Sequence, residues 1–326
     1  MMEEDRVVRL IQRRFGAAGP MLRLGIGDDA AVIRPRGAAE LWTITTDLLI
    51  EEVDFRRAWS TAEQLGHRAL AVNLSDIAAM GCRPRFYTVG LALPQDCDRS
   101  WIARFYRGMT ALGRRHGAQL VGGDLSRSPS ALQISVTVLG ETVRRKLLLR
   151  SGGRPGDLLY VTGTLGKAAA GLALLERGRR GGAAARSAVQ AHLRPEPRCE
   201  TGLWLCRHGA GAAAIDLSDG LSADLARLCR ASGVGAEIDE ASLPLFRASA
   251  RWQMDPLELG LHGGDDYELL FAVRPAAAAR LERDYPANLP TVTRIGRLTA
   301  QRDILLAGAV TTRLEPRGYD HFALRG

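Results

Sequence analysis

Residues 60–81, STAEQLGHRALAVNLSDIAAMG, predict an apolar helix that carries a few polar residues inside it. Thr61 can cap the helix together with the serine before it, with an acidic or amide residue in capping-box position, and the final glycine is a stop signal. Asp76 interrupts the apolar pattern, beside Asn73 and Ser75. Asp76 is therefore a candidate functional residue.

Strands and helices alternate on both sides of this helix. Strands are predicted over 41–46, 86–93, 119–121, 132–139, 158–162, 213–215, 236–239, 267–273 and 291–298, and further helices over 101–116, 167–177, 222–231 and 276–284. Residues 179–185, RRGGAAA, predict a loop. This alternation predicts an α/β or α+β fold in each half. The basic, Gly- and Pro-bearing segment 144–157 predicts a boundary between an N-terminal domain, 1–145, and a C-terminal domain, 146–326.

The composition is that of a soluble globular protein. Its 326 residues are 46% hydrophobic and 25% charged, enough for one large domain or two ordinary ones. No apolar stretch reaches the length of a membrane span, and the first residues, MMEEDRVVRLIQRRF, form a charged helical pattern unlike a signal peptide. The five cysteines contain no CxxC pair, which argues against a disulfide framework or a zinc site. We expect a cytoplasmic protein without a membrane partner.

The net charge of +8 raises the alternative of a nucleic-acid-binding protein. Only Lys146 and Lys167 among the 44 basic residues are lysines, and the arginines are scattered over both halves. The sequence has no long basic arm and no stripe of alternating arginine and aromatic residues. The net charge is thus the only feature of the sequence that supports a nucleic-acid-binding protein, and we expect no nucleic-acid partner.

Acidic residues recur where a strand-like run meets a glycine or a hydroxyl residue. They are Asp28 and Asp29 in GIGDD, Asp47 in TTD, Asp76 in LSD, Asp124 in GGD, Asp216 and Asp219 in DLSD, and Asp265 and Asp266 in GGDD. A single Asp beside Gly is usually a turn residue or a helix cap. Carboxylates that converge in one cleft repel unless a cation neutralises them, and oxygen ligands suit Mg²⁺, Mn²⁺ or Ca²⁺. With glycines that let the backbone approach phosphates, the pattern indicates metal-assisted phosphoryl chemistry.

The common phosphate-binding motifs are absent. GTLGKA, residues 163–168, lacks the spacing of a P-loop, and its lysine is followed by alanine. The chain has neither the HRD and DFG motifs of protein kinases nor HExxH or GxSxG. A nucleotide would therefore be held by another arrangement.

An ordered series of motifs resembles the thiamine-monophosphate kinase family, within the superfamily of aminoimidazole ribonucleotide synthetase. The series is GIGDDAAVI, TTDLLIEEVDF, RALAVNLSDIAAMG, GGDLS, RSGGRPGD, HLRPEPR, IDLSDGL, GGDDYELLF and GYDHF, from about residue 3 to residue 323. The resemblance implies an N-terminal α/β domain and a C-terminal α+β domain, with a homodimer formed through the N-terminal sheets. It further implies direct transfer of the ATP γ-phosphoryl group to thiamine monophosphate, giving thiamine diphosphate, with several Mg²⁺ ions.

The resemblance also assigns site residues. The metal shell would comprise Asp28, Thr45, Thr46, Asp47, Asp76, Asp124, Asp216 and Asp219, with Asp29 as a further contributor. The ATP-contacting positions would be Tyr106, Gly123, Asp124, Arg150 and Ser218. The substrate side would be Asp54, Asp265 and Tyr319, and the residues central to catalysis Asp47, Asp124 and Asp216.

Two substitutions set the chain apart from the family pattern. After TTD the family usually has EGxHF, whereas this chain has Glu52 for the glycine and Asp54 for the histidine. The family's GGEDYE is GGDDYE here, with Asp265 one methylene shorter than glutamate. Two alternatives stay open: a superfamily relative with another phosphate acceptor, and a non-catalytic regulator that binds nucleotide or metal.

Overall fold

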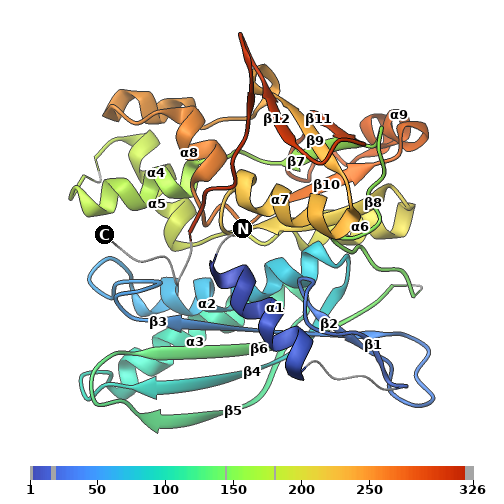
Figure 1. Cartoon of the computed structure of the whole chain (residues 1–326). Coiled ribbons are helices and arrows are strands. Elements are labelled where there is room, and N and C mark those ends of the chain that lie inside the picture. The colour runs from blue at the N-terminus through green and yellow to red at the C-terminus, as the bar shows by residue number, and fades with distance from the viewer. Residues whose placement is uncertain (1–2, 16–19, 144, 180, 320–326) are drawn as a thin grey trace.

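The computed structural model describes residues 3–15, 20–143, 145–179 and 181–319, which form two β-sheets with helices around them. The N-terminal half comprises α1 (Glu3–Phe15), β1 (Leu22–Leu24), β2 (Ala31–Ile33), β3 (Trp42–Ile50), α2 (Ala62–Ala79), β4 (Arg83–Leu93), α3 (Arg99–His116), β5 (Gln119–Arg127) and β6 (Gln133–Glu141). Its sheet occupies the lower part of Figure 1 and has the order β1-β2-β3-β6-β4-β5.

The C-terminal half forms the second sheet. Its elements are β7 (Leu158–Thr162), α4 (Lys167–Glu176), α5 (Ala183–Leu193), α6 (Cys199–His208), β8 (Gly211–Leu217), α7 (Leu221–Ser232), β9 (Gly235–Asp239), two short 3₁₀ helices (Glu240–Ser242 and Arg247–Trp252), α8 (Pro256–His262), β10 (Glu268–Val273), α9 (Pro275–Asp284), β11 (Val292–Thr299), β12 (Ile304–Ala307) and β13 (Thr311–Arg313). The strand order is β13-β12-β9-β11-β7-β10-β8. The predicted boundary between residues 145 and 146 falls in the connection between the sheets.

Helix α2 lies between the two halves. Thr61 accepts a hydrogen bond from the backbone N–H of Gln64, and the Gln64 side chain accepts one from Thr61, so the predicted capping box is confirmed. The helix packs on β3, β6 and α3 of its own half and on α6 and β8 of the other. Most of its residues are buried, including Asn73 and Ser75. Polar side chains on α2 can therefore face a site between the halves.

The hydrophobic core is shared between the halves. One cluster joins Leu74 and Ile77 of α2 to Tyr160 and Phe271 of the second sheet. On β10 the residues alternate, so that Leu270 instead joins a second cluster beneath α7. All six residues of β10 are buried because both faces of the strand are covered by packed side chains.

Strand β5 differs from the other strands of the first sheet because all nine of its residues are exposed. It pairs in parallel with β4 and forms the edge of the sheet. Gly123 lies so close to β4 that a Cβ there would be 2.0 Å from the backbone oxygen of Val89. Only glycine fits this position without displacing the strand.

Several elements differ from the prediction. Strand β3 continues past Asp47, and β5 continues through the GGD motif, so Asp47 and Asp124 lie within strands. The loop expected over 179–185 is interrupted where α5 begins at Ala183. Helix α6 and strands β12 and β13 were not predicted. None of the helices in the described ranges has both the length and the apolar character needed to cross a bilayer.

Candidate functional site

Three carboxylates from distant segments meet between the halves. Asp29 precedes β2, Asp76 lies on α2 and Asp216 lies on β8. Oxygen atoms of these side chains all lie within 4.8 Å of one another. Asp29 and Asp216 are buried and Asp76 is half-buried. The sequence predicted Asp76 and Asp216 as metal ligands with Asp29 as a further contributor, and the structure brings these three side chains together.

Each carboxylate is held by a neighbouring donor. Thr45 Oγ1 donates to Asp76 Oδ2 at 2.6 Å, and Ser75 Oγ donates to Asp216 Oδ2 at 2.7 Å. Arg150 donates to Asp29 Oδ1 through Nε, at 3.1 Å, and through Nη2, at 2.5 Å. Asp29 Oδ2 is buried and has no hydrogen-bond partner among the described residues.

Burial and repulsion between carboxylates raise the pKa of four acidic residues at this place, Asp28, Asp47, Asp76 and Asp216. The pKa of Asp76 and of Asp216 lies well above the usual value, because burial disfavours the charged form and neighbouring carboxylates add repulsion. Burial also raises the pKa of Asp28 to about 6 and that of Asp47 to about 6, with further repulsion from Asp29 and from Asp54 respectively. A divalent cation would remove this repulsion and give the unpaired Asp29 oxygen a partner, so the residues present fit a Mg²⁺ site.

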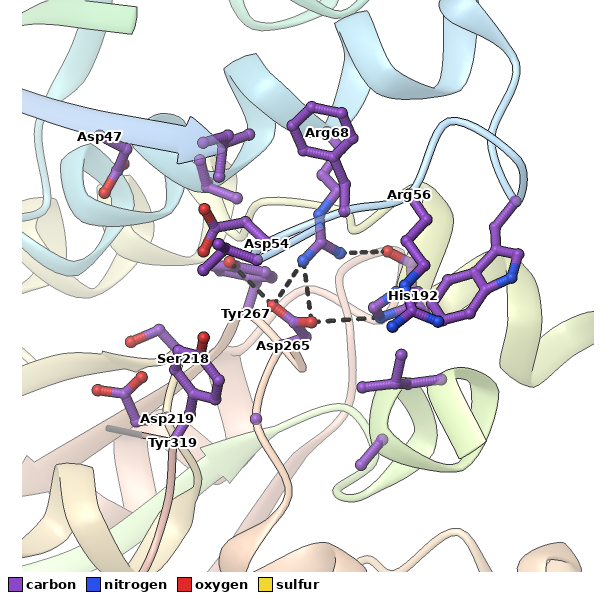
Figure 2. Close-up of a pocket in the computed structure, with 18 of the residues that line it drawn as sticks. Asp47, Asp54, Arg56, Arg68, His192, Ser218, Asp219, Asp265, Tyr267 and Tyr319 are labelled. Carbon is purple, nitrogen blue, oxygen red and sulfur yellow. Dashed lines mark hydrogen bonds and ion pairs between the residues drawn. The ribbon is translucent and has the colours of Figure 1, made fainter. Parts of the chain in front are cut away.

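A cavity of about 570 Å³ lies between the halves, beside this cluster. Figure 2 shows Asp47 and Asp54 on one side of it, and Ser218, Asp219, Asp265 and Tyr319 on the other. The structure thus brings together the three predicted substrate residues and part of the predicted metal and nucleotide set. The Asp47 charge also acts on Asp76, which links the cavity to the carboxylate cluster.

The two substituted positions of the loop after β3 shape one wall of the cavity. Glu52, where the family pattern has glycine, has a φ of 68°, the left-handed region that favours glycine. Asp54, where the family pattern has histidine, accepts a hydrogen bond from the backbone N–H of Ile50 at 2.7 Å. The left-handed backbone at position 52 explains why the family pattern has glycine there. Asp54 closes the turn through the hydrogen bond to its side chain.

Asp265 lies at the centre of a buried polar network (Figure 2). Arg68 Nη2 is 2.9 Å from both carboxylate oxygens of Asp265. Tyr267 Oη donates to Oδ1 at 3.2 Å, and His192 Nδ1 lies 3.2 Å from Oδ2. Arg68 and His192 hold the pKa of the Asp265 carboxyl well below its usual range despite burial.

Other predicted residues lie away from this cavity or face a different partner. Thr46 points to the opposite face of the sheet from Thr45 and is hydrogen-bonded to Thr137 Oγ1 at 2.8 Å. Asp219 lines the cavity and is ion-paired with Arg227. Asp28 accepts hydrogen bonds from the backbone N–H groups of Asp29 and Arg150.

The predicted nucleotide residues of the N-terminal half lie elsewhere. Tyr106 on α3 packs edge to face against Phe105, with ring centroids 5.5 Å apart. Gly123 and Asp124 lie on the exposed edge strand β5. In the described part of the chain, none of these three residues lines the 570 Å³ cavity, and their roles stay predictions.

Sequence reasoning missed Ser75, Arg68, His192 and Tyr267 as site residues. Ser75 left a signal, because a hydroxyl and an amide beside Asp76 break an apolar helical pattern. The sequence around Arg68 and His192 has no comparable pattern, and a single arginine does not stand out in this arginine-rich chain. Asp320 to Phe322 of the GYDHF motif lie outside the described residues.

Comparisons with known proteins agree with this architecture. Family models described as AIR synthase related protein match the chain twice, the N-terminal domain model over residues 27–142 and the C-terminal domain model over 154–307. The thiamine-monophosphate kinase of Bacillus subtilis (strain 168) is 37% identical over 306 residues, with 92% of this chain and 93% of that protein covered. That of Escherichia coli (strain K12) is 40% identical, with 93% of each covered.

A solved structure shows the same similarity. It is described as AaThiL complexed with AMPPCP and TMP, and it is 32% identical, with a TM-score of 0.85. The match covers 98% of this chain and 97% of that one. The predicted two-domain fold is confirmed, and the chain belongs to the thiamine-monophosphate kinase family.

Proposed function

We propose that this protein transfers the γ-phosphoryl group of ATP to thiamine monophosphate and releases thiamine diphosphate and ADP. The observation that carries the proposal is the buried carboxylate cluster of Asp29, Asp76 and Asp216 beside a cavity between the halves. Family membership narrows the phosphoryl acceptor to thiamine monophosphate. In the reaction, an oxygen of the acceptor phosphate bonds to the γ-phosphorus while the bond to the bridging oxygen of ADP breaks.

Asp29, Asp76 and Asp216 would hold Mg²⁺, with Asp28, Asp47 and Asp219 as further ligands around them. Bound Mg²⁺ would neutralise the phosphate oxygens, so that two anions can approach. Ser75 and Thr45 keep two of the carboxylates oriented, and Arg150 balances the charge of Asp29. The acceptor phosphate is already an anion, so the reaction needs no strong general base.

The cavity suits an acceptor with a cationic ring and an anionic tail. Six carboxylates and two arginines line it: Asp47, Glu52, Asp54, Glu176, Asp219, Asp265, Arg56 and Arg68. This excess of negative charge favours the cationic thiazolium ring, and the phosphate would lie toward the metal-binding end. Tyr319, which is 37% exposed, lines the cavity where an aromatic ring of the substrate could stack.

We infer further that the protein is a homodimer. The edge strand β5 exposes Leu120, Val121 and Leu125, and β3 of the same sheet exposes Leu48. Apolar side chains on an unpaired edge favour contact with a second sheet. A second copy would cover this surface, where Gly123 and Asp124 lie.

The proposal is tested by ³¹P NMR of the purified protein with ATP, Mg²⁺ and thiamine monophosphate, beside a sample without the acceptor. We expect ADP and thiamine diphosphate to appear only when the acceptor is present. Hydrolysis of ATP or nucleotide binding with no new diphosphate would overturn the proposal and favour another acceptor or a regulator. In that case Asp54→His would test whether the family's histidine restores the reaction.

A further inference from the structure

Arg68 is an arginine enclosed in the protein interior at the wall of the cavity. Its side chain is 5% exposed. Nη1 donates to the backbone oxygen of His192 at 2.5 Å, Nη2 contacts both oxygens of Asp265, and Nε has no hydrogen-bond partner among the described residues. A buried guanidinium with an unsatisfied donor is costly for stability, which points to a role other than stabilising the fold.

The contacts of Arg68 join the two halves of the molecule. Arg68 lies on α2, whereas Asp265 follows α8 and His192 lies near the end of α5. Figure 2 shows the guanidinium between the Asp265 carboxylate and the backbone of His192. The pair therefore depends on the packing of α2 against the C-terminal half.

Asp265 depends on these contacts for its orientation. Its backbone φ is 70°, and its N–H donates to Ser218 O at 2.7 Å. The main chain therefore fixes the position of the Asp265 Cα and Cβ atoms. The side chain is short and 24% exposed toward the cavity. Arg68 contacts both carboxylate oxygens, whereas Tyr267 and His192 each lie 3.2 Å from one of them. Arg68 is therefore the main restraint on the plane of the carboxylate.

We propose that Arg68 is a positioning residue that aims the Asp265 carboxylate at the phosphoryl acceptor and so determines acceptor affinity. The inference rests on the proposed function of this cavity as the acceptor site. Arg68 also offsets one of the six carboxylates around the cavity, so Asp265 presents a fixed hydrogen-bond acceptor and little net charge. It acts through Asp265 and does not itself contact the reacting atoms.

The test compares Arg68→Met, Arg68→Lys, Asp265→Asn and the double variant Arg68→Met/Asp265→Asn. We expect Arg68→Met to raise the KM for thiamine monophosphate about tenfold or more and to change the KM for ATP less than about twofold. Arg68→Lys keeps the charge but has one nitrogen, which cannot replace both the Nη2 contact with Asp265 and the Nη1 contact with the His192 backbone oxygen, so it should restore part of the affinity. Because Arg68 acts through Asp265, the double variant should be no worse than the worse single variant.

Arg198→Lys is the matched control. Arg198 forms a similar buried pair with Glu268, and neither residue lines the cavity. This variant should lower the melting temperature without changing the KM for thiamine monophosphate. The inference is overturned if Arg68→Met changes both KM values equally, leaves the acceptor KM unchanged, or adds to Asp265→Asn.

The wild-type protein separates this test from that of the function itself. Absence of turnover in the wild type would refute the proposed function. Calorimetric titration with thiamine monophosphate in the presence of Mg²⁺ and a non-hydrolysable ATP analogue then decides the role of Arg68. Equal dissociation constants of thiamine monophosphate for the wild type and Arg68→Lys would refute the positioning role of Arg68. The conservative variant Arg68→Lys also replaces Arg68→Met in the test if Arg68→Met does not fold.

Discussion

Asp76 and Asp216 lie in surroundings that disfavour their charged forms. Burial raises the pKa of both carboxyl groups well above the usual value, and repulsion from neighbouring carboxylates raises it further. The chain keeps these residues together although neutral side chains would fit the interior better. A cation-binding role accounts for this arrangement, because the bound ion removes the repulsion only in the folded state.

Asp216→Asn should therefore separate stability from activity. We expect the variant to melt at a higher temperature than the wild type in EDTA, because a buried charge is removed while Ser75 keeps a hydrogen-bond partner. It should lose most of the Mg²⁺-dependent rise in melting temperature and at least about a hundredfold in turnover. Thermal scans with and without Mg²⁺ check this. Asp303→Asn, at an exposed ion pair with Arg313, is the control and should behave as the wild type.

Contacts between distant residues limit what the sequence could predict about the site. The motifs identified Asp47, Asp54, Ser218, Asp219 and Asp265, all of which line the cavity. The partners Arg68 and Asp265 are 197 positions apart, and Ser75 and Asp216 are 141 apart. Neither pairing leaves a local pattern, since ion pairs and hydrogen bonds across domains depend on the tertiary fold alone.

Helix α2 carries Arg68, Ser75 and Asp76, so its position fixes the geometry of the site. Glycines set its distance from α3: a Cβ on Gly66 would lie 1.9 Å from the Phe105 backbone oxygen, and one on Gly108 would lie 1.9 Å from that of Glu63. The two helix backbones are in direct contact there. Glycine costs about 1 kcal/mol relative to alanine in a helix, and the close contact explains why it is retained.

Gly108→Ala should destabilise the protein although alanine is the better helix former. We expect the clash to outweigh the gain in helix propensity and to lower the free energy of unfolding by about 2 kcal/mol or more. Urea unfolding measures this. Gly181→Ala, where no atom lies within 4 Å of the added Cβ, should leave the unfolding midpoint unchanged. A stability of Gly108→Ala equal to that of Gly181→Ala would contradict the close contact.

The N-terminus of α4 is capped by a residue from another segment. Asp266 accepts hydrogen bonds from the backbone N–H groups of Gly166, at 2.5 Å, and Ala168, at 3.0 Å. Burial nevertheless raises the pKa of Asp266 to about 7. Between pH 7 and pH 4 the folded protein therefore holds a proton on Asp266, whereas the unfolded chain, with the ordinary pKa of 3.8, does not. The free energy of unfolding consequently rises as the pH falls from 7 toward 4.

Asp266→Asn removes this titration. The stability of the variant relative to the wild type should be most favourable at pH 8 and should decline toward pH 5, by at most about 1.4 kcal/mol per pH unit. Urea unfolding at intervals from pH 8 to pH 5 provides the comparison. Asp255→Asn, at an exposed cap of α8, is the control. A difference between Asp266→Asn and wild type that stays constant over this range would contradict the assigned pKa.

Local patterns predicted some elements well and missed others. The capping signals of α2 and the alternation of β6 specified those elements before any tertiary contact was known. Strand β5 was cut short in prediction because its glycines are typical of turns, whereas close pairing with β4 keeps them extended. Helix α5 was obscured because its start, Ala183, follows two glycines. These differences arise where packing overrides local preference.

One hydrophobic cluster spans the two halves, and the cavity lies where they meet. The cluster that joins α2 to the second sheet makes the position of each half depend on the other. The exposed edge β5 lies at the far side of the first sheet (Figure 1), and it is the surface that we propose for a second copy. The ordered motifs were enough to predict the fold and the family from the sequence. The position and length of the exposed edge could be recognised only from the strand order in the structure.

Leu125→Glu should therefore dissociate the proposed dimer. Leu125 is 59% exposed on β5, and a charge there would be buried between the copies. Light scattering should give twice 35.3 kDa for the wild type and 35.3 kDa for the variant at the same concentration. Val310→Glu, at a residue 75% exposed beside β13, should remain a dimer. A monomeric wild type would refute the dimer.

The five cysteines, Cys82, Cys97, Cys199, Cys206 and Cys229, are all free and buried. Burial raises the pKa of the Cys82, Cys199 and Cys229 thiols to about 12 and that of the other two above its usual value. Thiol reagents at neutral pH therefore find little native thiolate to modify. A cysteine introduced at each of two exposed positions, one on either sheet, would accept spin labels or fluorophores selectively. The distance between the two sheets could then be measured in solution without removing a native cysteine.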